Sequence, residues 1–231
     1  MTFETAGDAV HRLPDGRALH LLPERAAWLP EAGLLLVADA HFGKGASFRR
    51  LGVPVPRGTT HANLARLDAL VDRLAGVREL VFLGDFLHAA SGRAPATLQA
   101  LQVWRQRHAR LTMTLVRGNH DDHAGDPPAE LEMQVVDEPW LHAGLALCHD
   151  PATSRPQGCY ALAGHLHPAA RLGRGFDAVR LPCFHARAAG VMVLPAFGEF
   201  TGGALVRPAP GDLLYLVAGQ QVLAHPPSAA A

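Results

Sequence analysis

Six short runs of nearly uninterrupted apolar residues recur along the chain, with helical or loop-like segments between them. Strands with one face in water alternate apolar and polar residues, whereas continuous apolar runs are typical of strands covered on both faces. Every run is far shorter than the ~20 apolar residues that a membrane span needs. We therefore expect buried strands at residues 34–38, 80–83, 113–116, 145–148, 160–163 and 190–194.

Two segments between these runs carry apolar residues at helical spacing. Segment 59–74 places Leu64, Leu67 and Leu70 on one face, and Gly76 follows it as a plausible helix end. Segment 95–108 begins with a proline and turns a second apolar face inward. Alternating buried strands and helices predict an α/β fold.

The length and composition are those of one globular domain, with 231 residues and 48% hydrophobic content. We place this domain at residues 1–225 and expect a frayed tail at 226–231. Lys plus Arg and Asp plus Glu number 21 each, which argues against a wholly basic nucleic-acid-coating protein but allows a local basic rim. Three scattered cysteines and the lack of a signal-peptide pattern predict a cytoplasmic protein with no membrane partner.

Asp, His or Asn side chains follow five of the six runs, at the carboxyl ends of the expected strands. Binding sites in open α/β sheets assemble at those ends. A capping or turn role for all of them would need many coincidences. The residues, in chain order, are Asp39, His41, Asp85, Asn119, His120, Asp121, His149, His165 and His167.

These residue types suit a pair of metal ions. Imidazole and carboxylate together favour manganese, iron or zinc, whereas an all-oxygen site favours magnesium. Two ions about 3.5–4 Å apart need a carboxylate that bridges them, and Asp85 is central in the series. Asn119 offers a neutral carbonyl oxygen, which limits the negative charge that would repel a phosphate. The sequence therefore predicts a binuclear site for phosphate chemistry.

The ordered motifs DxH, GD, GNHD, H and GHxH between Asp39 and His167 resemble those of the calcineurin-like metallophosphoesterase superfamily. The resemblance implies a sandwich of two mixed β-sheets flanked by helices. It implies that one metal ion is bound by Asp39, His41, Asp85 and His167. It implies that a second is bound by Asp85, Asn119, His149 and His165. His120 would be the acid near the leaving group, and Asp121 would either orient it or cap a helix.

A narrower resemblance covers HFGKGASFRRLGVPVPRG at 41–58 and GDFLHA at 84–89. Both stretches are similar to the ligase-associated DNA-damage-response metallophosphoesterases of the PdeM type. That resemblance implies a manganese-dependent DNA endonuclease acting in DNA repair, with iron or zinc as alternative ions. DNA would be the substrate, and a ligase, helicase or exonuclease would be the partner protein. A homodimer is among the oligomeric states left open.

A basic cluster follows the first pair of expected ligands. It is either a clamp for backbone phosphates or a solvated loop face. Phe42 and Phe48 lie within the same stretch and either stack a base or pack locally. His88 either lines the pocket or packs its loop. The residues of the cluster are Lys44, Arg49, Arg50 and Arg57.

The predicted reaction is the attack of a metal-bridging hydroxide on a phosphodiester, most simply in DNA. One rival is a small-molecule phosphodiesterase or phosphomonoesterase with the same core. The other is a non-catalytic scaffold, which would be expected to have lost ligands that this chain retains. Turnover of a chromogenic phosphodiester with added manganese separates the scaffold from the enzymes.

Overall fold

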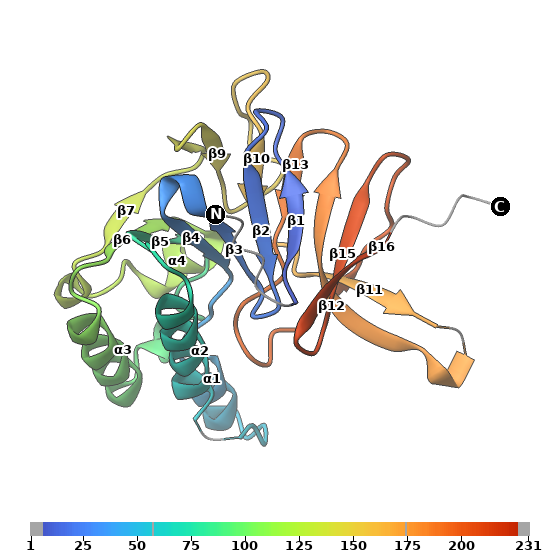
Figure 1. Ribbon diagram of the computed structural model, residues 1–231. Coiled ribbons are helices and arrows are strands. Elements are labelled where there is room, and N and C mark those ends of the chain that lie inside the picture. The colour runs from blue at the N-terminus through green and yellow to red at the C-terminus, as the bar shows by residue number, and fades with distance from the viewer. Residues whose placement is uncertain (1–6, 57, 174, 226–231) are drawn as a thin grey trace.

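In the computed structural model, which describes residues 7–56, 58–173 and 175–225, the chain forms two β-sheets packed face to face. Helices lie against the outer face of one sheet (Figure 1). The predicted α/β class and the sandwich of two mixed sheets are both confirmed. No helix among the described residues is long and apolar enough to cross a membrane.

The first sheet has seven strands in sequence order. Strands β1 to β4 pair antiparallel, and β4 to β7 pair parallel. The carboxyl ends of β4 to β7 therefore share one edge of the sheet. The strands are β1 (Ala9–Arg12), β2 (Ala18–Leu22), β3 (Ala26–Leu29), β4 (Leu34–Ala38), β5 (Glu79–Leu83), β6 (Thr112–Val116) and β7 (Gln134–Val136).

The second sheet has nine strands in the order β14-β11-β12-β13-β10-β9-β8, with β15 beside β12 and β16 beside β15. Strands β9, β10 and β13 pair parallel, and most others pair antiparallel. The strands are β8 (Trp140–His142), β9 (Leu145–Leu147), β10 (Ala161–Ala163), β11 (Pro168–Leu172), β12 (Val179–Arg187), β13 (Val191–Val193), β14 (Ala204–Leu205), β15 (Leu213–Ala218) and β16 (Gln221–His225).

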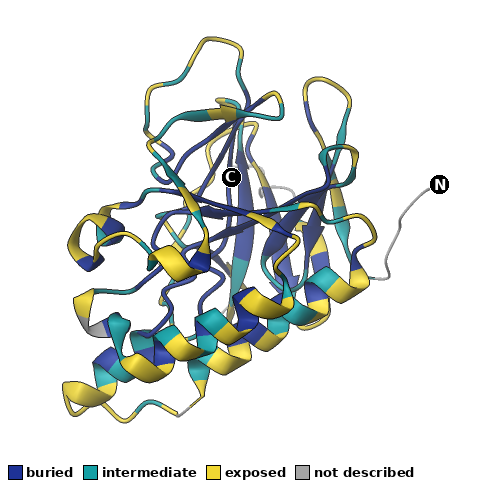
Figure 2. Cartoon of the chain, turned by 90° about the vertical axis from the view of Figure 1, so that its left-hand side faces the viewer, coloured by how far each residue is buried: buried dark blue, intermediate teal, exposed yellow. Residues whose placement is uncertain are grey.

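All four described α-helices fall between β4 and β7 in the chain. Helices α2 and α3 turn apolar side chains such as Leu67 and Trp104 onto the first sheet and leave their outer faces exposed (Figure 2). The helices are α1 (Lys44–Arg50), α2 (Thr59–Arg73), α3 (Pro95–Arg107) and α4 (Asn119–Ala124). Short 3₁₀ turns are η1 (Pro30–Ala32), η2 (Ala90–Arg93), η3 (Ala129–Leu131) and η4 (Gly175–Asp177).

Strand β4 shows why the apolar runs are continuous. Its residues Leu35 and Val37 pack toward the helices, whereas Leu36 and Ala38 pack against the second sheet. Both faces of the strand are therefore dry, and every side chain along it is apolar.

Each of the six predicted strands and both predicted helices is present, with ends that differ by at most two residues. The pattern did not predict strands such as β1, β12 and β16, which carry exposed positions. The stretch 41–58, which carries the basic cluster, contains helix α1. Arg171 and Leu172 lie on β11 and pair with β12. The predicted frayed tail at 226–231 lies outside the described residues.

Backbone hydrogen bonds continue past the strand ends at the shared edge. The His41 and Phe42 amides donate to the Asp85 and Phe86 carbonyls, each at 2.8 Å. From the other sheet, the Phe197 amide donates to the Ala38 carbonyl at 2.8 Å. The loops that follow β4 and β5 are thus held against each other and against the second sheet.

Candidate metal centre

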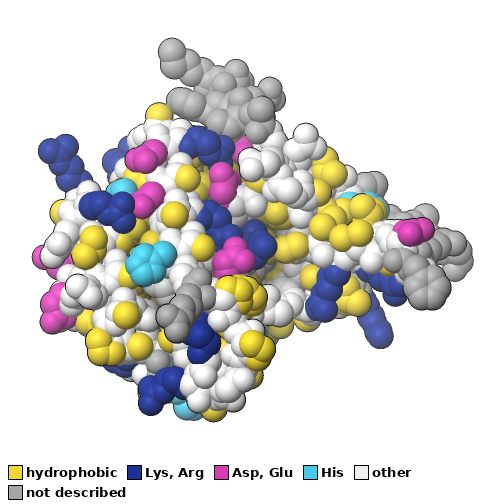
Figure 3. Space-filling view, turned by 90° about the horizontal axis from the view of Figure 1, so that it is seen from below, with side chains coloured by type: hydrophobic (Ala, Val, Ile, Leu, Met, Phe, Trp, Pro, Cys, Tyr) yellow, Lys and Arg dark blue, Asp and Glu magenta, His cyan; other side chains and the backbone are white. Residues whose placement is uncertain are grey.

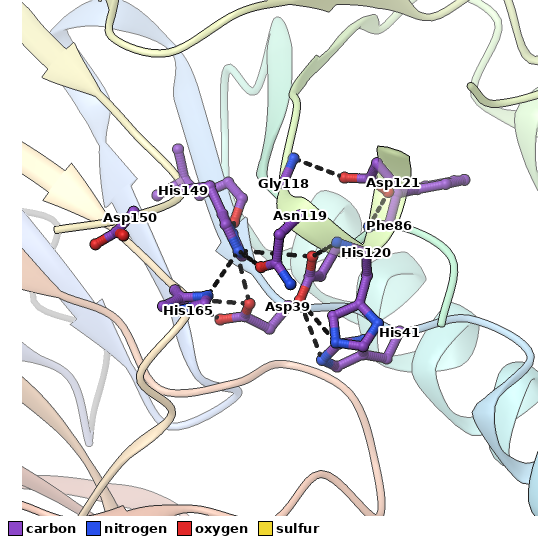
Figure 4. Close-up of polar contacts among 12 residues, drawn as sticks. Asp39, His41, Phe86, Gly118, Asn119, His120, Asp121, His149, Asp150 and His165 are labelled. Atoms are coloured by element: carbon purple, nitrogen blue, oxygen red, sulfur yellow. Dashed lines mark hydrogen bonds and ion pairs between the residues drawn. The ribbon is translucent and has the colours of Figure 1, made fainter. Parts of the chain in front are cut away.

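The seven candidate ligands come from both sheets and lie close together, as Figure 4 shows for Asp39, His41, Asn119, His149 and His165. The first sheet contributes loops after β4, β5 and β6, and the second contributes loops after β9 and β10. Because parallel strands end at one edge, residues far apart in sequence become neighbours. From the first sheet come Asp39, His41, Asp85 and Asn119, and from the second come His149, His165 and His167.

One group of four side chains presents ligand atoms that all lie within 4.8 Å of one another. Its members are Asp39, His41, Asp85 and His167, and the first three are at most 3% exposed. Both ring nitrogens of His41 and Nε2 of His167 are buried without a hydrogen-bond partner among the described residues. Such orphaned nitrogens are costly unless a cation or another group completes them.

A second group surrounds the ring of His149. Its Nδ1 lies 3.3 Å from the Leu83 carbonyl oxygen, and a proton on Nδ1 would satisfy that acceptor and leave the lone pair of Nε2 for a cation. Around that Nε2 lie Asn119 Oδ1 at 2.9 Å, His165 Nδ1 at 3.0 Å and Asp85 Oδ1 at 3.6 Å. Lone pairs therefore converge on one point, as they do around a cation.

Both groups fit divalent metal ions by their donor chemistry. Imidazole nitrogens mixed with carboxylate and amide oxygens are the ligands of manganese, iron and zinc. Asp85 belongs to both groups, because its Oδ2 lies 3.7 Å from His41 Nε2 and its Oδ1 faces His149. The side chain thus occupies the position that a bridging carboxylate needs.

Five of the seven candidate ligands have a left-handed backbone. Their φ values are positive, from 45° at His41 to 68° at His165, although none is glycine. Residues held in this region cost about 1–3 kcal/mol each and cluster at functional sites. The conformation turns consecutive side chains of a tight loop toward one centre. The five are Asp39, His41, Asp85, His165 and His167.

Two glycines of the sequence motifs leave room for the ligands. A Cβ at Gly118 would lie 2.6 Å from Asp85 Oδ1, and a Cβ at Gly164 would lie 2.7 Å from Asp39 Oδ2. Real Cβ atoms do not approach oxygen so closely, so any side chain there would displace a carboxylate. The glycines of GNHD and GHxH are therefore part of the site's geometry.

The surroundings of Asp85 and His41 shift the pKa of each side chain toward its neutral form. Burial raises the pKa of Asp85, and burial together with the charge of Lys44 lowers the pKa of His41. A neutral imidazole is the form that binds a metal ion, and a nearby cation would restore the charge of the carboxylate.

His120 lies at the rim of the site with 42% of its side chain exposed. Its Nδ1 donates to the His88 carbonyl at 3.0 Å, and its Nε2 lies 4.0 Å from Asp85 Oδ2. The His88 ring stacks on that of His120 at 5.6 Å between centroids and also contacts Phe48. Burial, then Lys44 and His120, lower the pKa of His88 to about 4, so this ring is neutral at pH 7. His88 thus contacts both the His120 ring and Phe48 of α1, and its lining of the pocket stays a prediction.

Asp121 holds loops together and does not hydrogen-bond the His120 ring. Its two oxygens accept from the Gly118 amide at 2.9 Å and the Phe86 amide at 3.0 Å. Of the two roles considered, the structure shows capping of α4 and, in addition, a link between the loops after β5 and β6. Burial raises the pKa of this carboxyl to about 6.

The members of the basic cluster that the structure describes differ in their contacts. Lys44 is partly buried, and its charge reaches Asp39 and Asp85. Arg49 donates to the Val55 and Pro56 carbonyls, at 3.4 Å and 2.9 Å, so part of its capacity serves its own loop. Arg50 is exposed at the end of α1. Arg57 lies outside the described residues. Phe42 is 1% exposed and packs in the core.

The sequence prediction missed Glu138. Its Oε2 accepts from the amides of His149 at 2.6 Å and Asp150 at 2.8 Å, and so fixes the backbone of a candidate ligand. Glu138 follows β7, which pairs parallel with β6 and ends at the same edge. The strand-end rule would have found it if residues 134–136 had been recognised as a strand.

Known proteins resemble this chain at the level of the family and of the whole fold. The family model for calcineurin-like phosphoesterases matches residues 34–185. A Pseudomonas putida nuclease, MPE, has a crystal structure that is 45% identical to this chain with a TM-score of 0.81, covering 94% of this chain and all of that one (100%). A protein of unknown function from Aquifex aeolicus, AQ665, is 20% identical with a TM-score of 0.38, covering 58% of this chain and 78% of that one. No curated protein matches the chain.

The shared position of Asp85 predicts different metal contents for two variants. Asp85→Ala removes a ligand from both groups, whereas His41→Ala removes one ligand from one group. After equilibration with manganese and desalting, we expect His41→Ala to keep about one ion per chain and Asp85→Ala to keep almost none, against about two in the wild type. Equal metal contents in the two variants, measured by mass spectrometry, would contradict the bridging position.

The contact of Glu138 with the His149 backbone predicts a positioning role. We expect Glu138→Ala to weaken manganese binding by about 10–100-fold, the usual effect of removing a group that holds a ligand. Glu138→Gln keeps an acceptor oxygen and should retain most of the affinity. The matched control is Asp137→Ala, which removes a neighbouring charge that is ion-paired with Arg117. If calorimetry finds the same loss for Asp137→Ala, charge and not positioning explains the effect.

Proposed function

The chain belongs to the calcineurin-like phosphoesterase family, and we propose that it is a metal-dependent phosphodiesterase that cuts DNA. One observation carries the proposal: acceptor atoms from both sheets, several of them fully buried, converge on two adjoining points beside the partly exposed His120. Such a centre serves the hydrolysis of phosphoesters. The likeness to a nuclease over nearly the whole chain supports a nucleic acid over a small molecule.

The candidate ligands hold the ions, and the remaining polar groups act on the substrate. Two bound divalent ions would supply a water of lowered pKa and would neutralise charge on the phosphate oxygens. Asn119, which is exposed, can donate through its amide NH₂ to a phosphate oxygen while its Oδ1 faces His149. This neutral side chain adds no negative charge that would repel the substrate.

His120 is proposed to protonate the leaving oxygen. The protonated ring has an N–H on each nitrogen, and the His88 carbonyl accepts the one on Nδ1. Nε2 then remains free at the rim, 4.0 Å from Asp85 Oδ2 and therefore beside the candidate centre. A deoxyribose alkoxide is a poor leaving group, so a positioned acid is worth about 10²–10⁴-fold in rate.

The basic side chains near α1 are proposed to serve the substrate's charge. Lys44 lies nearest the centre and would approach the phosphate that reacts. Arg50 is exposed and would contact the polymer farther along its backbone. Arg49 is proposed to shape the loop that carries them.

The finer parts of the proposal rest on the resemblance to repair-associated enzymes. We infer manganese as the native ion, a role in DNA repair in the cytoplasm, and a ligase, helicase or exonuclease as partner. We also infer that residues 1–225 fold as one domain. The mixed nitrogen and oxygen ligands are compatible with manganese.

A substrate panel tests the function. Metal-stripped protein is mixed with manganese, magnesium, zinc or iron, and with labelled single-stranded DNA, duplex DNA, RNA or a chromogenic phosphodiester or phosphomonoester. We expect internal cutting of DNA that requires manganese and stops with a chelator. Hydrolysis of the small esters without any cutting of DNA would establish the small-molecule rival instead. Loss of all turnover despite bound metal would favour the scaffold.

Leaving-group dependence tests the role of His120. We expect His120→Ala to lower kcat/KM on DNA by about 10²–10⁴-fold and to affect a nitrophenyl diester much less, because nitrophenolate leaves without a proton. His123→Ala is the control, since this exposed histidine lies on the same helix. An equal loss on both substrates would mean that His120 supports the metal centre and does not act as the acid.

A further inference from the structure

Two cavities of opposite charge adjoin the candidate metal centre. On the side of His149 and His165 lies a cavity of about 300 Å³, and on the side of His167 lies one of about 180 Å³. The first is lined by the carboxylates of Asp122, Asp137, Glu138 and Asp150. The second is lined by Arg25 and Arg180 and by no carboxylate among the described residues.

The acidic cavity is a poor place for a second phosphate. Its one arginine, Arg117, is ion-paired with Asp126 at 3.0 Å and with Asp137 at 2.5 Å. The remaining carboxylates would repel a polyanion. A strand that crosses the centre is therefore favoured on the His167 side.

The basic cavity has groups free to bind an anion. Neither Arg25 nor Arg180 has an ion-pair partner among the residues that the structure describes. Thr201, on the same wall, has a buried hydroxyl without a hydrogen-bond partner in the described part of the chain. Two guanidinium groups and a hydroxyl are the donors that phosphate-binding sites use.

A third arginine, Arg66, lies close to Arg25 and carries the same charge. Arg66 is ion-paired with Glu199 at 2.7 Å, donates to the Phe197 carbonyl and lies over the Phe197 ring. Burial, and then the charge of Arg25, lower the pKa of Arg66, so the two cations repel each other. Arg25 itself sits in the β2–β3 turn with φ at 65°. An anion beside Arg25 would relieve this repulsion.

Arg180 is carried by the β11–β12 hairpin, which projects from the body of the protein (Figure 1). Strand β11 begins at Pro168, directly after His167, and Arg180 pairs with Arg171 across the hairpin. Lys and Arg side chains lie along this projection and, beside Asp and Glu side chains, in the centre of the same underside (Figure 3). The hairpin thus connects Arg180, which lines the cavity, to the loop that carries the candidate metal ligand His167.

The cavity is smaller than the ~300–1,000 Å³ of typical small-molecule sites, which suits one phosphate and not a whole nucleotide. We propose that Arg25, Arg180 and Thr201 bind the internal phosphodiester that neighbours the scissile phosphate on the His167 side. The inference rests on the proposed nuclease function and names the second phosphate that the enzyme holds. The acidic cavity beside His149 and His165 disfavours the other course for the strand.

The test uses thymidine nitrophenyl phosphodiesters with the scissile ester on the 3′ or the 5′ oxygen. Each is made with the other oxygen free, carrying a methyl phosphodiester, or carrying a phosphate monoester. The readout is the ratio of kcat/KM with and without the added group, so any general loss of activity in a variant cancels. Melting temperatures confirm that each variant is folded.

For one of the two isomers we expect the added methyl phosphodiester to raise kcat/KM of the wild type about tenfold, because hydrogen bonds to charged groups are strong. In Arg25→Ala/Arg180→Ala this ratio should fall to about one. Arg25→Lys/Arg180→Lys should keep part of the gain. The matched control is Arg110→Ala, which removes an exposed arginine just before β6, at the opposite edge of the sheet.

Three results would overturn the proposal. The first is an undiminished ratio in the double alanine variant. The second is a gain from the monoester alone, which would mean that the cavity binds strand ends. The third is no gain in the wild type, with an equal loss on all substrates in the variant, which would place the scissile phosphate itself between the arginines. The nuclease function is tested separately by manganese-dependent cutting of DNA by the wild type. If the wild type cuts DNA, that function holds whatever the ratio shows, and if it does not, that function is refuted.

Discussion

The mutual repulsion of unprotonated acceptor atoms is the constraint on which this structure depends. Asp85 faces His41 on one side and His149 on the other, with further oxygens and nitrogens within hydrogen-bond distance of them. In a buried setting, such atoms stay together only if the fold holds them and a cation completes them. Asp85, shared by the two groups, is therefore the residue on which both metal positions depend.

The fold holds these atoms together through hydrogen bonds of the loop backbone, some of them to other backbone groups and some to buried carboxylates. Parallel strands bring the loops to one edge, and amide-to-carbonyl bonds from His41 and Phe197 tie those loops together. Asp121 and Glu138 add carboxylate bonds to the amides beside the ligands. Together these contacts offset the cost of the left-handed conformations of the ligand loops.

Continuous apolar runs predict the buried strands because both faces of those strands are dry, and each ligand follows a run directly. Features that depend on register or on antiparallel turns could not be predicted. Arg25 lies in a hairpin turn and Arg180 in a projecting hairpin, and nothing in their sequence context indicates that they face one cavity. The bond from the Phe86 amide to Asp121 likewise exists only once β5 and β6 pair.

A crystal structure of the manganese-loaded protein, with anomalous diffraction recorded at the metal edge, tests the central claim most directly. We expect two anomalous peaks about 3.5–4 Å apart, both within coordination distance of Asp85. One peak should contact His41 and His167, and the other should contact His149 and His165. A single peak, or peaks more than about 5 Å from these side chains, where bonds of about 2.0–2.2 Å are expected, would contradict it.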